Sequence, residues 1–414
     1  MRRETDLRQR EDGGNEPTDG TVCSFNATTR AGDGSISEIP TNMADQSDKG
    51  QAHRVLIPAP AVVGTAVSER FYLPQLDGLR FFAFLAVFLD HGVSGTYRGW
   101  LAHLQPLGSF GVDLFFVLSS YLLTTLLLRE QAATGRIDVV AFWIRRGLRI
   151  WPLYLVCVAV IAAGTSLSWW YLLGMATFTF NWQVVVPFAG SLALLEVIGP
   201  LWSLSVEEQF YGAWPLLLRL GATPRRVLWL AALMLAGAVI ARAAVVLLGL
   251  GWEAIRFSSI TRLDGMAVGA ALAAWPRPSR LPAWVGPVAG IITLGLLSAM
   301  QILVPFSASP TAFEILRGLM AAGMLGGLLW VVVHASPGVL ASRPLVYLGR
   351  ISYGLYVFHG AMYALTHWAG LRWQSRLPVA FLLTLAVAAL SYRYLERPFL
   401  RLKQRYARVE SAPV

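Results

Sequence analysis

The sequence predicts an all-α integral membrane protein, a polytopic bundle of about ten transmembrane helices with one re-entrant or interfacial segment at residues 169–188. Two observations lead to this fold class. The chain of 414 residues is 55% hydrophobic and only 14% charged, whereas soluble domains carry about 25% charged residues. It also contains ten apolar stretches that are long enough to cross a bilayer, which takes roughly 17–25 residues.

The first 70 residues are expected to form a disordered cytoplasmic tail. They are polar, rich in Gly, Ser and Thr, and without hydrophobic periodicity, so they cannot bury enough apolar surface to fold. They carry 8 basic and 11 acidic side chains, although the whole chain has a net charge of +10. No apolar stretch follows the first basic residues, which argues against a secretory signal. Met43 is a candidate for an alternative start.

A membrane domain is expected at 71–400, followed by a short basic cytoplasmic tail at 401–414. The predicted spans lie near 79–98, 108–128, 150–167, 200–218, 227–250, 260–275, 284–305, 313–334, 351–370 and 378–396. Arginine and lysine clusters separate several of them, at 129–149, 219–226, 277–280, 343–350 and 397–408.

These clusters predict the topology. With ten spans and both termini in the cytoplasm, every cluster faces the cytoplasmic side of a plasma membrane, as the positive-inside rule prefers. Arg372 and Arg376 are the exceptions. An eleventh crossing at 169–188 would place the next three clusters outside. This aromatic segment is therefore interpreted as re-entrant or interfacial, which is allowed where protein covers its backbone.

Composition excludes several functional classes. Only Cys23 and Cys157 are present, which excludes a disulfide framework, and no Cys/His cluster has the spacing of a metal site. We therefore expect no metal. The basic charge is explained by arginines that flank membrane spans, and no motif indicates a nucleic-acid partner.

Two ionisable residues in the first predicted span share one helical face. Arg80 and His91 are eleven residues apart, which brings His91 about 20° past three full turns and roughly 16 Å along the axis. Ionisable groups at bilayer depth are costly, so they favour a functional interpretation. The pair suits a long donor with a phosphorylated head and a reactive far end, such as acyl-CoA. Arginine binds phosphate oxygens bidentately, and a neutral imidazole can remove a proton from an attacking hydroxyl.

Other polar groups in the predicted spans extend the candidate site. They are Asp113, Ser119, Ser120, Glu207, Glu208, Gln209, Arg262, Asp264, Ser352, Tyr353 and His359. Ser352 and His359 are seven residues apart and share a face within about 20°. Asp90 points about 100° away from His91 on the same helix and is not expected to orient it.

Each of these groups also has a structural interpretation. Arg80 can snorkel to the interface, and Glu208 can pair with an arginine that ties two helices together. Asp113 and Asp264 can accept hydrogen bonds from backbone N–H groups at helix starts. His359 can form a hydrogen bond with a backbone carbonyl instead of taking part in catalysis.

Seven motifs, in order, resemble acyltransferase family 3, a family of integral-membrane O-acyltransferases. They are LDGLRFFAFLAVFLDHG, FGVDLFFVLSSYLL, FWIRRGLRIWPLY, LWSLSVEEQFY, TRLDGMAVGA, GRISYGLYVFH and SYRYLERP, and they cover roughly 73–400. The resemblance implies transfer of an acyl group, acetyl or another short one, from cytoplasmic acyl-CoA to a hydroxyl. It implies an acceptor such as a carbohydrate, a cell-surface glycan, a lipid-linked sugar or a sugar-bearing secondary metabolite.

The resemblance also implies roles for residues of this chain. We expect His91 to act as general base, and Glu208 or Asp113 to orient an imidazole or contact the acceptor. Direct transfer and a covalent acyl-enzyme both stay open. The candidate donor-binding residues are Arg80, Arg145, Arg146 and Arg149, and the candidate catalytic residues are His91, Glu208, Asp113 and His359.

Two other classes of function are compatible with the same residues. A transporter or flippase for a sugar, lipid or proton-coupled substrate would line its pathway with the same intramembrane His, Glu and Arg. Such a protein would move substrate without consuming acyl-CoA. A catalytically inactive member would instead serve as a binding or assembly partner, and its cellular role would not depend on His91.

Overall fold

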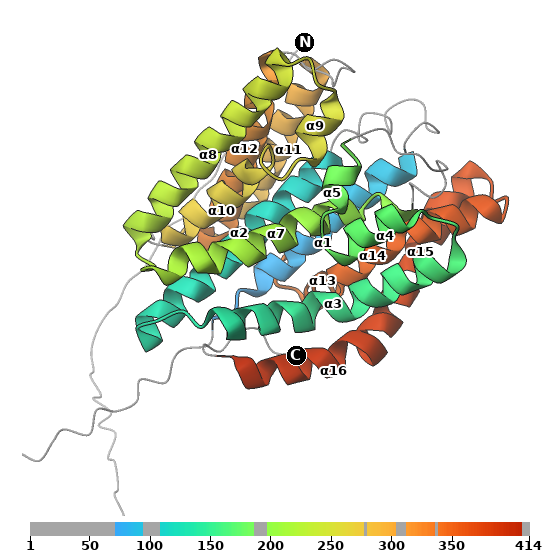
Figure 1. Ribbon diagram of the computed structural model, residues 1–414, viewed down its shortest axis with the longest axis horizontal. Coiled ribbons are helices and arrows are strands. Elements are labelled where there is room, and N and C mark those ends of the chain that lie inside the picture. Colours follow the sequence, from blue (N-terminus) through green and yellow to red (C-terminus); the bar gives the residue numbers. More distant parts are fainter. Residues whose placement is uncertain are drawn as a thin grey trace, which may run out of the picture. The chain divides into compact units, whose positions relative to one another are not determined.

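The computed structural model describes residues 71–93, 108–185, 197–276, 280–303, 312–335 and 338–407. All of these residues belong to one compact unit. Its helices are α1 (Pro74–Val93), α2 (Gly108–Thr134), α3 (Val139–Gly164), α4 (Trp169–Ala176), α5 (Phe180–Gln183), α7 (Leu201–Arg219), α8 (Pro224–Leu247), α9 (Trp252–Phe257), α10 (Leu263–Ala274), α11 (Val285–Leu303), α12 (Ala312–Ala335), α13 (Arg343–Arg350), α14 (Ser352–Trp368), α15 (Trp373–Ser391) and α16 (Arg397–Lys403) (Figure 1).

The described part of the chain is all-α and contains no strand, as the composition predicts. Five of its helical stretches are long and apolar enough to cross a membrane: Gly108–Thr134, Val139–Gly164, Pro224–Leu247, Glu314–Ala335 and Gln374–Tyr406. They establish the predicted fold class, an all-α membrane protein. The count of about ten spans stays a prediction.

Helices α1 and α7 carry four of the ionisable residues of the candidate site, Arg80 and His91 on α1 and Glu207 and Glu208 on α7. They contain 20 and 19 residues, which at 1.5 Å per residue nearly match a hydrocarbon core of about 30 Å. The predicted tail at 1–70, the end of the first predicted span at 94–98, and residues 408–414 lie outside the described residues.

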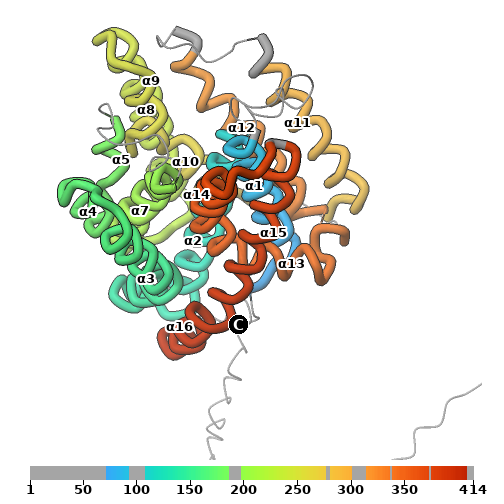
Figure 2. The backbone as a smooth tube through the Cα atoms, turned by 90° about the vertical axis from the view of Figure 1, so that its right-hand side faces the viewer, coloured from blue at the N-terminus to red at the C-terminus, as the bar shows by residue number. Residues whose placement is uncertain are grey.

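Helix α2 is the most enclosed of the five membrane-spanning candidates. Within its apolar window 72% of residues are buried, compared with 22% for α8. Figure 2 shows α1, α2, α10 and α14 near the middle of the helices, with α3 and α4 to one side and α13 and α15 to the other. Contact between α2 and α10 depends on Gly269, because a Cβ there would collide with the carbonyl oxygen of Val117.

The aromatic segment at 169–188 does not form one long helix in its described part. It folds into α4 and α5, of 8 and 4 residues, which pack against α3 and α7. Phe178 turns the chain between them with φ of 55°, and its ring stacks on Tyr154 at a centroid distance of 4.6 Å. Helices this short cannot cross a bilayer. Whether the segment is re-entrant or interfacial stays a prediction, and residues 186–188 lie outside the described ranges.

The chain leaves α15 through a π-helical turn at Tyr392–Glu396 and continues into α16. Helix α16 lies along α3, as Figure 1 shows for the red and green helices. This contact brings the end of the described chain beside the arginine-rich first half of α3. Arg145 there donates from Nη1 to the carbonyl oxygen of Tyr406 at 2.8 Å.

Candidate functional site

Three arginines converge on a cavity among α1, α2, α3, α7 and α14, here called the arginine cavity. Arg80 comes from α1, and Arg146 and Arg149 come from α3, where a spacing of three residues places them on one face. Arg80 pairs with Asp77 at 3.0 Å. Arg146 and Arg149 form no ion pair or hydrogen bond with a described residue, so their donors remain available to an anionic ligand.

Arg146 is instead held by aromatic rings. Its guanidinium lies 5.7 Å from the ring centroid of Phe142 and 5.8 Å from that of Tyr211, which is within cation–π range. Arg145, the first arginine of the predicted trio, does not line the arginine cavity. It pairs with the buried Glu130 at 2.8 Å, so the structure places it in a helix-joining contact.

One carboxylate lies among these arginines. Glu207 on α7 lines the arginine cavity and accepts hydrogen bonds from Ser119 Oγ at 3.1 Å and from Tyr211 Oη at 2.9 Å. Its neighbour Glu208, the predicted catalytic carboxylate, lines neither this cavity nor the one described next. Glu208 accepts from Trp151 Nε1 at 3.0 Å, and its other oxygen is buried with no hydrogen-bond partner in the described structure.

A second cavity lies at the other end of α1 and is here called the histidine cavity. His91 lines it together with Asp90 and Asp113. His91 Nδ1 lies 2.9 Å from the carbonyl oxygen of Val87. A carbonyl oxygen can only accept, so Nδ1 of neutral His91 carries the proton, and the lone pair is on Nε2. The side chain is exposed, and the geometry therefore offers Nε2 as a base.

His359 on α14 lies beside His91, with ring centroids 5.0 Å apart. It is fully buried, and its Nδ1 lies 2.5 Å from the carbonyl oxygen of Tyr356, as the structural interpretation of this residue expects. Its Nε2 has no hydrogen-bond partner among the described residues. His359 itself does not line the histidine cavity, so it contacts His91 from the interior of the protein.

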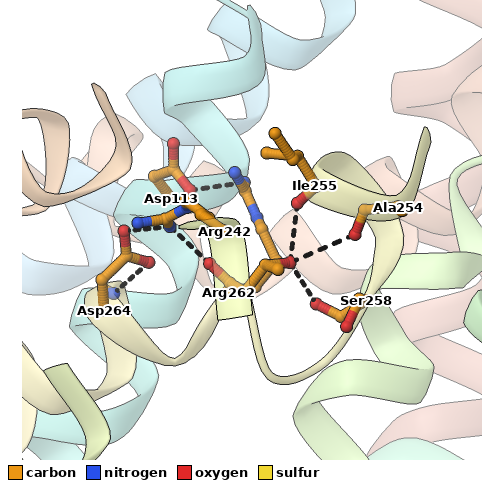
Figure 3. A network of polar contacts seen from close by, with 9 residues as sticks. Asp113, Arg242, Ala254, Ile255, Ser258, Arg262 and Asp264 are labelled. Carbon is orange, nitrogen blue, oxygen red and sulfur yellow. Dashed lines mark hydrogen bonds and ion pairs between the residues drawn. The ribbon is translucent and has the colours of Figure 1, made fainter. Parts of the chain in front are cut away.

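Asp113 binds an arginine rather than a helix N-terminus. Its Oδ1 accepts from Arg262 Nη2 at 2.5 Å. A second buried ion pair, between Arg242 and Asp264, lies close by (Figure 3). Asp264 also accepts from the N–H of Gly265 at 2.9 Å, which agrees with its predicted helix-start role. These pairs fix the chain at the start of α10 against α2 and α8.

The two cavities share a wall. Val112 on α2 and Tyr356 on α14 line both. Tyr356 Oη lies 2.7 Å from Ser203 Oγ and donates to the carbonyl oxygen of Pro200 at 3.1 Å, which holds the ring in place. The face shared by Arg80 and His91 on α1 therefore runs from one cavity to the other.

Sequence reasoning did not identify four of the charged residues that line the histidine cavity, which are Arg242, Arg256, Glu314 and Arg317. Arg256 lies in the last turn of α9. Glu314 and Arg317 form an ion pair of 3.2 Å within α12. Glu314 and Arg317, three residues apart in a predicted apolar span, gave the signal of an intramembrane pair. Arg256 has no such signal, because it lies in a short helix between two predicted spans.

The family model of the acyltransferase domain matches residues 73–393 of this chain. Among curated proteins, the chain is similar to a Staphylococcus aureus (strain COL) protein provisionally named an O-acetyltransferase, with 30% identity over 379 residues, 81% of this chain and 58% of that protein. It is also similar to the O-acetyltransferase OatA of Staphylococcus aureus (strain NCTC 8325 / PS 47), with 29% identity over 374 residues, 79% of this chain and 57% of OatA. The chain thus spans somewhat more than half the length of these relatives. No solved structure matches it significantly.

Proposed function

The chain belongs to the acyltransferase domain family, as its seven motifs predict, and we propose that it moves an acyl group from acyl-CoA to a hydroxyl group. The acyl group is acetyl or another short one, and the acceptor is a carbohydrate, a cell-surface glycan, a lipid-linked sugar or a sugar-bearing small molecule. One observation supports this most directly. A cavity with available arginine donors adjoins a cavity with an available imidazole base, and the two share a wall.

In this proposal the arginine cavity holds the phosphates of acyl-CoA. Arg146 and Arg149 supply charge-assisted hydrogen bonds, which are strong for guanidinium and phosphate, and Arg80 adds a third cation at the start of α1. Arg145 acts indirectly, because its ion pair with Glu130 fixes the part of α3 that carries the other two. The pantetheine arm then passes Tyr356 toward His91, a distance of roughly 16 Å along α1.

His91 performs the proton transfer in the histidine cavity. Nε2 takes the proton of the acceptor hydroxyl as its oxygen attacks the carbonyl carbon of the thioester. The carbon–sulfur bond breaks, the CoA thiolate leaves, and the imidazolium returns the proton. The Val87 carbonyl accepts from Nδ1 and stabilises the imidazolium. Asp113, bound to Arg262, offers oxygen atoms to the acceptor, and Glu208 remains a prediction as a supporting carboxylate.

The arrangement in the membrane is part of the proposal. We place the open side of the arginine cavity at the cytoplasmic face of the plasma membrane, where acyl-CoA is made, with both termini on that side. The histidine cavity then lies deeper or toward the opposite face, where a glycan acceptor is reached. Ten spans satisfy this arrangement and the positive-inside rule together.

Wild-type protein in lipid nanodiscs, supplied with acetyl-CoA labelled in its acetyl group, tests the proposal. We expect saturable binding and slow release of labelled acetate in the absence of an acceptor. A transporter would instead move solutes across proteoliposomes without consuming the thioester, and an inactive assembly partner would bind acetyl-CoA without hydrolysing it. Failure to bind any short- or long-chain acyl-CoA would refute the donor assignment.

A further inference from the structure

The histidine cavity is lined by four arginines, and three of them are neutralised by nearby carboxylates. Arg262 binds Asp113 at 2.5 Å. Arg242 binds Asp264, as Figure 3 shows, and a third pair, described above, joins two residues of α12. Each pair is buried or nearly so, and its arginine is therefore neutralised by a carboxylate of the protein itself.

Arg256 is the fourth arginine, and it differs from the others. It lines the cavity but forms no ion pair or hydrogen bond with any residue that the structure describes. Two rings hold it, with Trp252 at 5.3 Å and Phe257 at 5.7 Å from its guanidinium carbon. Aromatic contacts position a guanidinium while leaving its N–H donors unused. Arg256 therefore presents fixed, available donors to the cavity.

Asp90 contributes a negatively charged side chain on another wall of the same cavity. It lies beside His91 on α1 and makes no ion pair or hydrogen bond with a described residue. Asp90 and Arg256 line the same cavity, and no ion pair or hydrogen bond joins them. A cation and an anion thus face one cavity without neutralising each other directly. A ligand that fits between them needs an anionic group for Arg256 and hydroxyl donors for Asp90.

We propose that the histidine cavity binds an acceptor that carries an anionic group, a sugar acid or a sugar phosphate, and that Arg256 recognises this group. Bound in this way, the acceptor presents hydroxyls to Asp90 and His91, which are consecutive on α1. This inference rests on the proposed function for the identity of the cavity as the acceptor site. It narrows the acceptor from any hydroxyl compound to polyhydroxylated anions.

A cysteine reporter in the cavity measures the recognition without knowledge of the natural acceptor. Ser109 lines the cavity, and Ser109→Cys is made in a full-length chain with Cys23→Ser and Cys157→Ser. In nanodiscs, modification rates are measured for a sulfonate-bearing and a trimethylammonium-bearing methanethiosulfonate, each normalised to a free thiol. Protection is measured with methyl glucuronide, glucose 1-phosphate and neutral methyl glucoside.

We expect the sulfonate reagent to modify the introduced cysteine faster than the trimethylammonium reagent does. We also expect the anionic sugars to protect this cysteine from modification better than methyl glucoside does. Arg256→Gln should reduce the affinity of the anionic sugars by about tenfold or more, because the variant loses charge-assisted hydrogen bonds to the anionic group. Arg256→Lys should retain much of the preference, and Asp90→Asn should increase it. Protection by the glucuronide alone assigns a carboxylate, and protection by the phosphate alone assigns a phosphate.

Arg372→Gln is the matched control. Arg372 is exposed at the turn between α14 and α15, at the same end of the bundle as Gly92, which packs against Tyr363 and Leu377. Its replacement should leave the charge preference unchanged. Equal protection by neutral and anionic sugars, an unchanged preference in Arg256→Gln, or no modification by either reagent would overturn the proposal. None of these readouts uses acetyl-CoA, so the donor assay tests the proposed function separately.

Discussion

His91 Nδ1 lies 2.9 Å from the carbonyl oxygen of Val87, one turn earlier on α1. This contact fixes the tautomer of the neutral imidazole, because the carbonyl requires a donor. The lone pair is then on Nε2, on a side chain that lines a cavity. The helix backbone thus performs the orienting role that a carboxylate performs in many histidine bases.

Replacement of His91 by Gln should remove turnover and leave donor binding intact. A general base contributes about 10²- to 10⁴-fold to rate, so we expect acetyl-CoA hydrolysis to fall by that factor while binding changes little. His334→Gln is the control, because His334 Nδ1 makes the same kind of contact to Trp330 at 2.7 Å on α12, and His334 does not line the histidine cavity. Equal loss in both variants would show that the effect is structural.

The three arginines of α3 should separate into two classes. Arg146→Gln and Arg149→Gln should each weaken CoA binding by about tenfold, because each loses a charge-assisted hydrogen bond of about 1.5–3 kcal/mol. Arg145→Gln should leave binding closer to wild type and destabilise the fold, since it strands the carboxylate of Glu130, which is 3% exposed. Equilibrium binding and thermal unfolding in detergent distinguish these results. Arg225→Gln, at an exposed position on α8, serves as the control for net charge.

Asp113 and Arg262 should show strong energetic coupling. Removing one partner of a buried ion pair leaves an uncompensated charge and costs about 3–5 kcal/mol. Asp113→Asn and Arg262→Gln should each be more destabilising than the double variant, which strands neither charge. A double-mutant cycle on thermal or denaturant stability measures the coupling. If the destabilisation by the two single substitutions adds up in the double variant, the ion pair between Asp113 and Arg262 does not contribute to stability.

Gly269 should be essential for the contact between α10 and α2. Gly269→Ala places a methyl group against the Val117 carbonyl, and overpacking of this kind costs about 1–3 kcal/mol. Gly323→Ala on α12 is the matched control, because a Cβ there meets nothing within 4 Å. We expect the control to be neutral or stabilising. Equal stability of the two variants, measured by thermal unfolding, would contradict the packing described for α10.

The sequence predicts much of this fold because helix periodicity and apolar length are local properties. The shared face of Arg80 and His91 follows from eleven residues of one helix, and the structure places both side chains in cavities with a common wall. The contact of His91 with His359 joins residues from helices far apart in the chain. No local pattern encodes it, because it depends on how α1 and α14 pack.

The remaining differences between the predicted and the observed site concern residues that are adjacent in the sequence. Glu207 and Glu208 differ by about 100° around α7, and only the packing of α7 against α2 and α3 determines that Glu207 reaches the arginine cavity. In the same way, the sequence predicts a cluster of cations at Arg145, Arg146 and Arg149, but the partner of Arg145 lies on α2. Sequence identifies the chemical groups, and tertiary packing decides which of them meet.

Photoaffinity labelling with two acyl-CoA analogues tests most directly whether one donor spans both cavities. One analogue carries a photoreactive group on the adenine and the other carries it at the acyl end, and labelled peptides are identified by mass spectrometry. We expect the adenine probe to label α3 near Arg149, and the acyl probe to label the end of α1 near His91. Labelling of one cavity by both probes, or labelling of α1 that excess CoA does not suppress, would contradict it.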